Sequence, residues 1–130
     1  MIPVFLSSEE IQALHQSQIE AWGGHHGLRD AGALESAVAA PQHHFVYGTG
    51  NLFDCAAALM FALITNHPFL DGNKRAGTLA AAVMLEMNGV RLCSEPTWFS
   101  RLEQLTWKTA KAEASREDLA AVLRDGATRD

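Results

Sequence analysis

The sequence predicts an all-α protein, a compact single-domain bundle of about six helices with two buried central helices. Capping residues and apolar stripes of helical period recur along the whole chain. Two consecutive segments in the middle are apolar nearly all round, which is typical of buried helices. Only residues 2–6 and 90–93 have the composition of short extended pieces. With 130 residues, of which 48% are hydrophobic, the chain has the size of one domain over 1–130.

The first two predicted helices are marked by their N-caps. Ser7 precedes a glutamate by three residues, the spacing of a capping box, and the apolar stripe behind it should end near Gly23. Asp30 can cap the second helix. Pro41 should stop this helix, because proline disfavours helical geometry in the residue before it. Residues 42–50 are then expected to form a loop.

The third and fourth predicted helices should form the buried centre. The third begins near Asn51 and is almost wholly apolar until Pro68, which pushes His67 out of helical geometry. The fourth runs from about Gly72 to Asn88, and its run of alanines allows close approach to a neighbour. A turn of only a few residues therefore joins the two most buried helices.

Two further helices complete the prediction. One spans about residues 97–112, and Ser115 with Asp118 indicates the cap of a last short helix that ends near Gly126. The large apolar residues of the longer helix should be core or partner surface rather than a ligand site: Trp98, Phe99, Leu102, Leu105 and Trp107.

Charge and cysteine usage exclude several classes of protein. The net charge is -5 and the sequence pI is about 5.6, so no basic surface is expected to bind nucleic acid directly. The longest apolar run is too short to span a membrane, and the N-terminus lacks the pattern of a signal peptide. Cys55 and Cys93 lack the spacing of a zinc site and define no disulfide framework. We therefore expect a soluble, cytoplasmic protein with no membrane partner.

Polar residues concentrate in the turn between the two central helices, residues 67–75. Lys74 and Arg75 lie in the first turn of a helix, where the helix dipole makes each cation unfavourable by roughly 0.3–1 kcal/mol. A bound phosphate chain would compensate both, because free backbone N–H groups and the dipole also favour an anion there. Gly72 lets the backbone approach such a ligand closely. The turn therefore predicts a phosphate site.

The remaining polar residues of the turn suggest catalysis. Asp71 supplies a carboxylate suited to Mg²⁺, and the amide of Asn73 can orient the loop or donate to a phosphate. His67 can take a proton from an attacking hydroxyl near neutral pH. In the competing interpretation, Asp71 merely caps the fourth helix and pairs with Arg75, while His67 is a core histidine.

Residues 67–75, with the sequence His-Pro-Phe-Leu-Asp-Gly-Asn-Lys-Arg, resemble the signature of the Fic/Doc superfamily. The upstream segments 27–30 and 34–37, with Pro41, are similar to the Doc (death-on-curing) branch. This resemblance implies ATP and Mg²⁺ as cofactors, His67 as general base and Asp71 as metal ligand. It also places three residues around the phosphates: Asn73, Lys74 and Arg75. Of these, Asn73 and Arg75 are expected to take part in catalysis as well.

Two positions favour the Doc branch over the AMP-transferring Fic pattern. Lys74 stands where that pattern has glycine, and Thr78 stands where it has a second arginine, whereas Gly72 is more typical of Fic proteins. The resemblance to Doc implies a toxin that phosphorylates a threonine of translation elongation factor Tu and blocks translation. An AMP transferase is the alternative, and a catalytically weak interaction module is the second alternative.

The same resemblance implies a partner. Fic-type enzymes are often restrained by an inhibitory helix containing Glu followed by Gly or Asn, and neither dipeptide occurs in this chain. We therefore expect restraint by a small antitoxin of the Phd type, a segment of which orders on an apolar groove.

Other polar residues have less specific interpretations. The pairs at 25–26 and 43–44 are adjacent histidines, which offer at best one ligand each to a shared metal. Residues 43–50 resemble the flap on which these enzymes dock a target, with a structural loop as the equal alternative. Arg29 and Asp30 are expected to form a turn and a helix cap.

Overall fold

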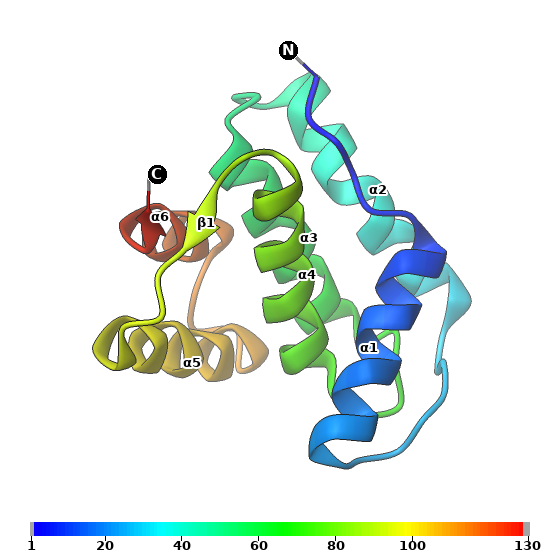
Figure 1. Cartoon of the computed structure of the whole chain (residues 1–130). Helices are drawn as coiled ribbons and strands as arrows, with labels where there is room; N and C mark the ends of the chain where they lie inside the picture. The colour runs from blue at the N-terminus through cyan, green and yellow to red at the C-terminus, as the bar shows by residue number, and fades with distance from the viewer. Residues whose placement is uncertain (1, 129–130) are drawn as a thin grey trace.

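The computed structural model describes residues 2–128, which fold into six α-helices and one small pair of strands (Figure 1). The all-α prediction is confirmed. In chain order the elements are α1 (Ser8–Trp22), α2 (Ala31–Tyr47), α3 (Leu52–Asn66), α4 (Asn73–Met87), β1 (Arg91–Leu92), α5 (Pro96–Ala110), α6 (Arg116–Asp125) and β2 (Ala127–Thr128).

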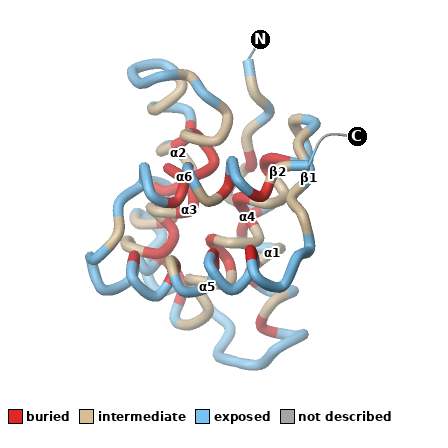
Figure 2. The backbone as a smooth tube through the Cα atoms, turned by 90° about the vertical axis from the view of Figure 1, so that its left-hand side faces the viewer, coloured by how far each residue is buried: buried red, intermediate tan, exposed pale blue. Residues whose placement is uncertain are grey.

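Helices α3 and α4 form the centre of the molecule, as the sequence predicts. Both carry much of the buried surface in Figure 2, and α3 packs against α2, α4 and α6. The two central helices approach closely at Gly77, where a Cβ atom would lie 3.2 Å from the Met60 carbonyl oxygen and from Ile64 Cγ1. A larger residue would push α4 away from α3. Among the described residues, no helix is both long and apolar enough to cross a membrane.

The predicted helix starts are confirmed by their caps. Ser7 and Ser115 each form a capping box with the acidic residue three positions later. The Asp30 carboxylate accepts a hydrogen bond from the Ala33 N–H at 3.0 Å and caps α2. Asn51 caps α3 in the same way. Helix starts are set by local hydrogen bonds, which explains why the sequence locates these four well.

The prediction that Pro41 ends the second helix is wrong. Helix α2 continues to Tyr47, with Pro41 buried inside it, so most of the expected loop over 42–50 is helical. Proline in a helix costs about 3 kcal/mol through a lost hydrogen bond and a clash with the preceding turn. Here Phe45, beyond the proline, packs against the core and meets the Phe5 ring edge-on with 6.3 Å between centroids. Packing of Phe45 against the core helps to offset the penalty, and this packing is a tertiary effect.

The expected extended pieces are only partly confirmed. Within residues 90–93, β1 forms and pairs antiparallel with β2. The sequence did not predict β2. Residues 2–6 form no strand in the described chain, because a side chain takes the place of a strand partner. The amide of Asn88 accepts from the Val4 N–H at 2.7 Å and donates to the Val4 carbonyl at 2.9 Å.

Candidate active site

The turn between α3 and α4 is held by the segment that precedes α2. Leu28 and Phe69 form an antiparallel bridge. The Arg29 N–H donates to the Pro68 carbonyl at 2.7 Å, and the Leu70 N–H donates to the Gly27 carbonyl at 3.1 Å. The two segments that suggested a family resemblance are therefore neighbours in space, and the upstream segment supports the turn.

His67 lies at the C-terminus of α3 and is exposed, so the core-histidine interpretation is wrong. Its backbone is left-handed, with φ 49° and ψ 56°. Pro68 cannot continue the helix, which fixes the exit of the chain at this residue. The side chain of His67 is consequently exposed at the end of α3.

Asp71 is held as an anion by two backbone donors. Its Oδ1 accepts from the Gly72 N–H at 2.8 Å and its Oδ2 accepts from the His25 N–H at 3.2 Å. These hydrogen bonds, first that of His25, lower the pKa of the carboxyl, and the nearby Arg75 lowers it further. Gly72, not Asp71, is the N-cap of α4, and no ion pair joins Asp71 to Arg75 in the described chain. The competing interpretation of Asp71 is therefore wrong, because within the described residues Asp71 neither caps α4 nor forms an ion pair with Arg75.

Asn73 orients the loop. Its Oδ1 accepts from the Phe69 N–H and its Nδ2 donates to the Phe69 carbonyl, each at 3.0 Å. This double hydrogen bond closes the turn over residues 69–73. Of the two roles that the sequence left open for Asn73, the geometry favours the orienting one.

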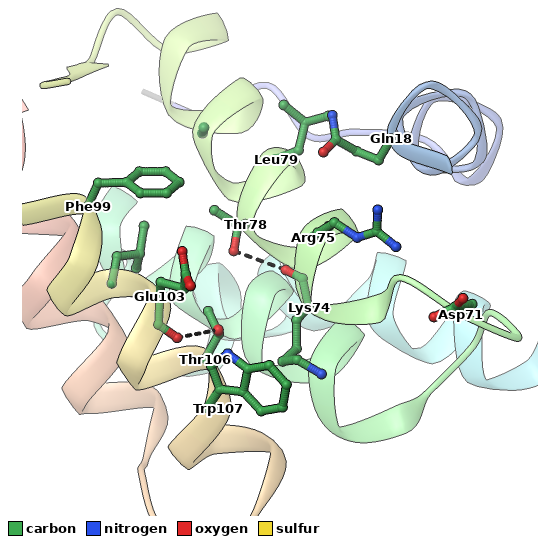
Figure 3. Close-up of a pocket in the computed structure, with 12 residues that line it drawn as sticks. Gln18, Asp71, Lys74, Arg75, Thr78, Leu79, Phe99, Glu103, Thr106 and Trp107 are labelled. Atoms are coloured by element: carbon green, nitrogen blue, oxygen red, sulfur yellow. Dashed lines mark hydrogen bonds between the residues drawn. The ribbon is translucent and has the colours of Figure 1, made fainter. Parts of the chain in front are cut away.

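The start of α4 offers donors and cations together. Gly72 has a left-handed φ of 76° and provides no side-chain cap, and within residues 2–128 the backbone N–H groups of Asn73, Lys74 and Arg75 have no partner. The Lys74 ammonium lies over the indole ring of Trp107 in α5, 4.3 Å from the ring centroid, while the Arg75 guanidinium lies on the side of Asp71 (Figure 3). The two cations therefore flank the helix start on opposite sides.

A cleft of about 620 Å³ opens between α1, α4 and α5 at this helix start (Figure 3). One end is polar, and the walls toward α5 are largely apolar. The cleft is lined by Gln18, Asp71, Lys74, Arg75, Thr78, Leu79, Ala82, Phe99, Leu102, Glu103, Thr106 and Trp107. Of the five aromatic and apolar residues of α5 singled out in the sequence, Trp98 and Leu102 are buried in the core, whereas Phe99 and Trp107 are half-exposed.

His15 is a residue of the site that the sequence analysis missed. It is buried in α1, its ring is stacked on Phe69, and its Nε2 lies 2.7 Å from the Asp71 carbonyl oxygen. Burial lowers its pKa, which favours the neutral ring. A signal was present, because Ile11, His15 and Ile19 recur every four residues on the buried stripe of α1.

The remaining candidate residues have structural roles or are not grouped as metal ligands within residues 2–128. Asp30 caps the N-terminus of α2, as expected. The Arg29 side chain donates to carbonyl groups at the end of α3 and so caps the C-terminus of that helix. In the expected flap, Tyr47 is exposed and its ring lies 4.8 Å from that of His43. Among residues 2–128, no group of three or more His, Cys, Asp or Glu side chains is placed to hold a metal.

The donor set at the turn fits a magnesium nucleotide. Unpartnered N–H groups at a helix start together with two cations are suited to a phosphate chain. Each carboxylate oxygen of Asp71 accepts one backbone hydrogen bond and keeps a lone pair that could bind a metal ion.

Comparison with known proteins gives concordant matches. The family model described as Fic/DOC family matches residues 5–85. A protein named Toxin Doc from Mycolicibacterium smegmatis is 41% identical over 106 residues, which cover 79% of this chain and 80% of that protein. Protein kinase doc of Escherichia phage P1 is 33% identical over 120 residues, which cover 92% of each chain.

Proposed function

Because this chain belongs to the Fic/DOC family, in its Doc branch, we propose that it is a toxin that acts as an ATP-dependent protein kinase. The names of the two relatives, Toxin Doc and Protein kinase doc, agree with this proposal. The reaction moves the γ-phosphate of ATP to a hydroxyl of a target protein in the cytoplasm. From the resemblance to Doc, the target is a threonine of elongation factor Tu, and the consequence is arrest of translation.

One observation supports the proposal most directly. The exposed His67 at the end of α3 and the unpartnered N–H groups at the start of α4 are brought together by a turn of six residues, 67–72. The proposed proton acceptor and the proposed phosphate site thus lie at the two ends of one short turn. Phosphoryl transfer needs this pair of functions and little covalent chemistry from the protein.

Each residue of the turn has a distinct role. The imidazole of His67 takes the proton of the attacking hydroxyl. The helix start, Lys74 and Arg75 bind the phosphates, and Asn73 keeps the turn in shape. Asp71 holds Mg²⁺ through its ionised carboxylate. ATP supplies the phosphoryl group, and Mg²⁺ offsets the charge that develops on it.

Lys74 and Thr78 favour phosphate transfer over AMP transfer. Both residues line the cleft on the α5 side of the helix start. AMP transfer would place the β- and γ-phosphates deep in the anion site, where a lysine side chain takes up room and Thr78 brings no charge. The opposite placement of ATP, with the γ-phosphate toward His67, avoids both problems. Protein AMP transfer is the alternative function.

Labelled ATP distinguishes the two reactions. We expect a candidate target such as elongation factor Tu to be labelled by γ-labelled ATP, with release of ADP, and not by α-labelled ATP. His67→Ala is the control, because it removes the proton acceptor and leaves the phosphate site. Label from the α-position alone would identify an AMP transferase and refute the kinase, while no label from either position would favour an interaction module.

A small antitoxin is the proposed partner. The apolar wall of the cleft, with Phe99 and Trp107 half-exposed, suits the apolar face of a helix, and its polar end suits acidic residues. A Phd-type segment seated there would cover the phosphate site. Expression of the chain alone should slow growth, and expression of His67→Ala should not. Normal growth with active wild-type protein and no partner would refute the toxin function.

A further inference from the structure

We propose that Arg29 is a positioning residue that holds His67 in its left-handed backbone conformation, a role that rests on the proposed function of His67 as base. The guanidinium reaches across from the segment before α2 to the last turn of α3. Its Nε donates to the His67 carbonyl at 2.6 Å, and its Nη2 donates to the Asn66 carbonyl at 2.8 Å. Both distances are those of charge-assisted hydrogen bonds.

The end of α3 needs an external donor. A helix that ends in a left-handed residue usually satisfies its last carbonyls with backbone N–H groups of the residues that follow. Pro68 follows His67 and has no N–H, and the N–H of His67 itself makes no hydrogen bond within residues 2–128, so neither backbone bond forms here. The last turn of α3 also contains no basic residue of its own. Arg29 therefore supplies both the donors and the positive charge that a helix C-terminus favours.

His67 has a reason to depart from this conformation. Its φ of 49° lies in the region that residues with a Cβ atom rarely adopt. Its side chain is exposed and forms no hydrogen bond within the described residues, so its own contacts do not fix the backbone. The hydrogen bond from Arg29 to its carbonyl is then a contact that restrains this backbone, and through the backbone the direction of the imidazole.

Arg29 is itself well placed to act as a fixed support. Its backbone N–H donates to the Pro68 carbonyl at 2.7 Å, and the next residue, Asp30, caps α2. The side chain thus starts from a segment already hydrogen-bonded to the turn. Nε and Nη2 form one edge of the planar guanidinium, and a lysine offers no such pair of fixed donors.

The test compares Arg29→Met, which removes both donors, with Arg29→Lys, which keeps the charge and one flexible donor. Asp30→Ala is the matched control, because it weakens the neighbouring cap of α2 and leaves the end of α3 intact. We expect Arg29→Met to lower kcat by about tenfold to a hundredfold with little change in the KM for ATP, since the base is misplaced and the phosphate site is not. Arg29→Lys should recover part of kcat, and Asp30→Ala should keep it.

A second measurement needs no substrate. The three-bond HN–Hα coupling and the Cα chemical shift of His67 report its backbone conformation by NMR. In Arg29→Met both should move away from the left-handed values, and in Asp30→Ala they should not. Unchanged His67 signals in Arg29→Met would overturn the proposal, as would an equal loss of kcat in Asp30→Ala. If the wild-type chain transferred no phosphate, the kinase proposal would fail, while the His67 signals would still decide whether Arg29 holds this backbone.

Discussion

The imidazole of His15 lies flat on the ring of Phe69, with 3.8 Å between the ring centroids and 4° between the ring planes. Its Nε2 lies 2.7 Å from the Asp71 carbonyl oxygen, which requires a proton on that nitrogen. Helix α1 therefore supports the turn as well, in addition to the segment before α2. Burial lowers the pKa of His15 and favours its neutral form at this position.

His15 should make the stability of the protein depend on pH. Because burial lowers its pKa, the unfolded chain binds a proton more readily than the folded chain. Its contribution to stability is full above about pH 6.5, the ordinary value for histidine, and is lost as the pH falls through the lower pKa of the folded state. Urea unfolding across this range measures the effect. His15→Gln keeps a donor but does not titrate, so an unchanged pH dependence in this variant would assign the effect to other groups.

Gly24 should tolerate substitution less well than Gly23, although both have positive φ. At Gly23, with φ 87°, nothing lies within 4 Å of an added Cβ atom. At Gly24, with φ 122°, the Cβ would lie 2.7 Å from Asp71 Oδ2. We expect Gly23→Ala to cost about 1–3 kcal/mol from backbone strain, because its φ of 87° and ψ of 170° lie in a region almost exclusive to glycine. Gly24→Ala should cost about 1 kcal/mol more from overpacking. Equal costs by urea unfolding would show that the loop moves freely away from Asp71.

Lys74 and Trp107 should be energetically coupled. The ammonium lies 4.3 Å from the indole centroid, and Trp107 is 54% exposed. A cation–π contact at an exposed site contributes about 0.5–1 kcal/mol. A double-mutant cycle of Lys74→Met and Trp107→Leu on the free energy of unfolding measures this coupling. Trp107→Phe keeps an aromatic face and should retain part of it, whereas a coupling of zero would mean that the contact does not stabilise the protein.

His67→Ala should separate binding from catalysis. The variant loses the proton acceptor but keeps the helix start and both cations that bind the phosphates. Mg-ATP at about 100 times its Kd should stabilise the variant and the parent alike, by about 2.7 kcal/mol, while phosphate transfer is lost. His26→Ala, exposed between α1 and α2 and outside the cleft, is the control for removal of a histidine. A variant that transfers phosphate at the parental rate would disprove the assignment of the base.

Asp71→Asn should change the response to Mg²⁺. The amide keeps the shape of the side chain but loses the charge, so more Mg²⁺ should be needed for half-maximal transfer. The variant also presents an amide NH2 group to one of the two N–H donors of Gly72 and His25, so one of these hydrogen bonds should be lost. Asp125→Asn, on α6, changes the same charge outside the cleft. An unaltered Mg²⁺ titration would contradict the metal role of Asp71.

The sequence alone predicted the local features of the chain. Helix starts can be predicted because an N-cap is made by residues only two or three positions apart. Four starts are marked in this way, by Ser7, Asp30, Asn51 and Ser115. The nearly all-round apolar composition of α3 identified a central helix, since every face of that helix is in contact with another element or the core. The turn at 67–75 was found because its polar residues interrupt the most apolar part of the chain.

The tertiary structure alone decided which distant residues shape that turn and its cleft. His15 reaches the Asp71 carbonyl across 56 residues, and Arg29 reaches the His67 carbonyl across 38. Pro41 stays inside a helix because Phe45 beyond it is packed on the core, and Trp107 meets Lys74 because α5 folds back on α4. Periodicity and capping describe a chain over one or two helical turns, whereas these contacts depend on how whole helices pack. The sequence therefore determined where the candidate site lies along the chain, and packing decided what holds it in place.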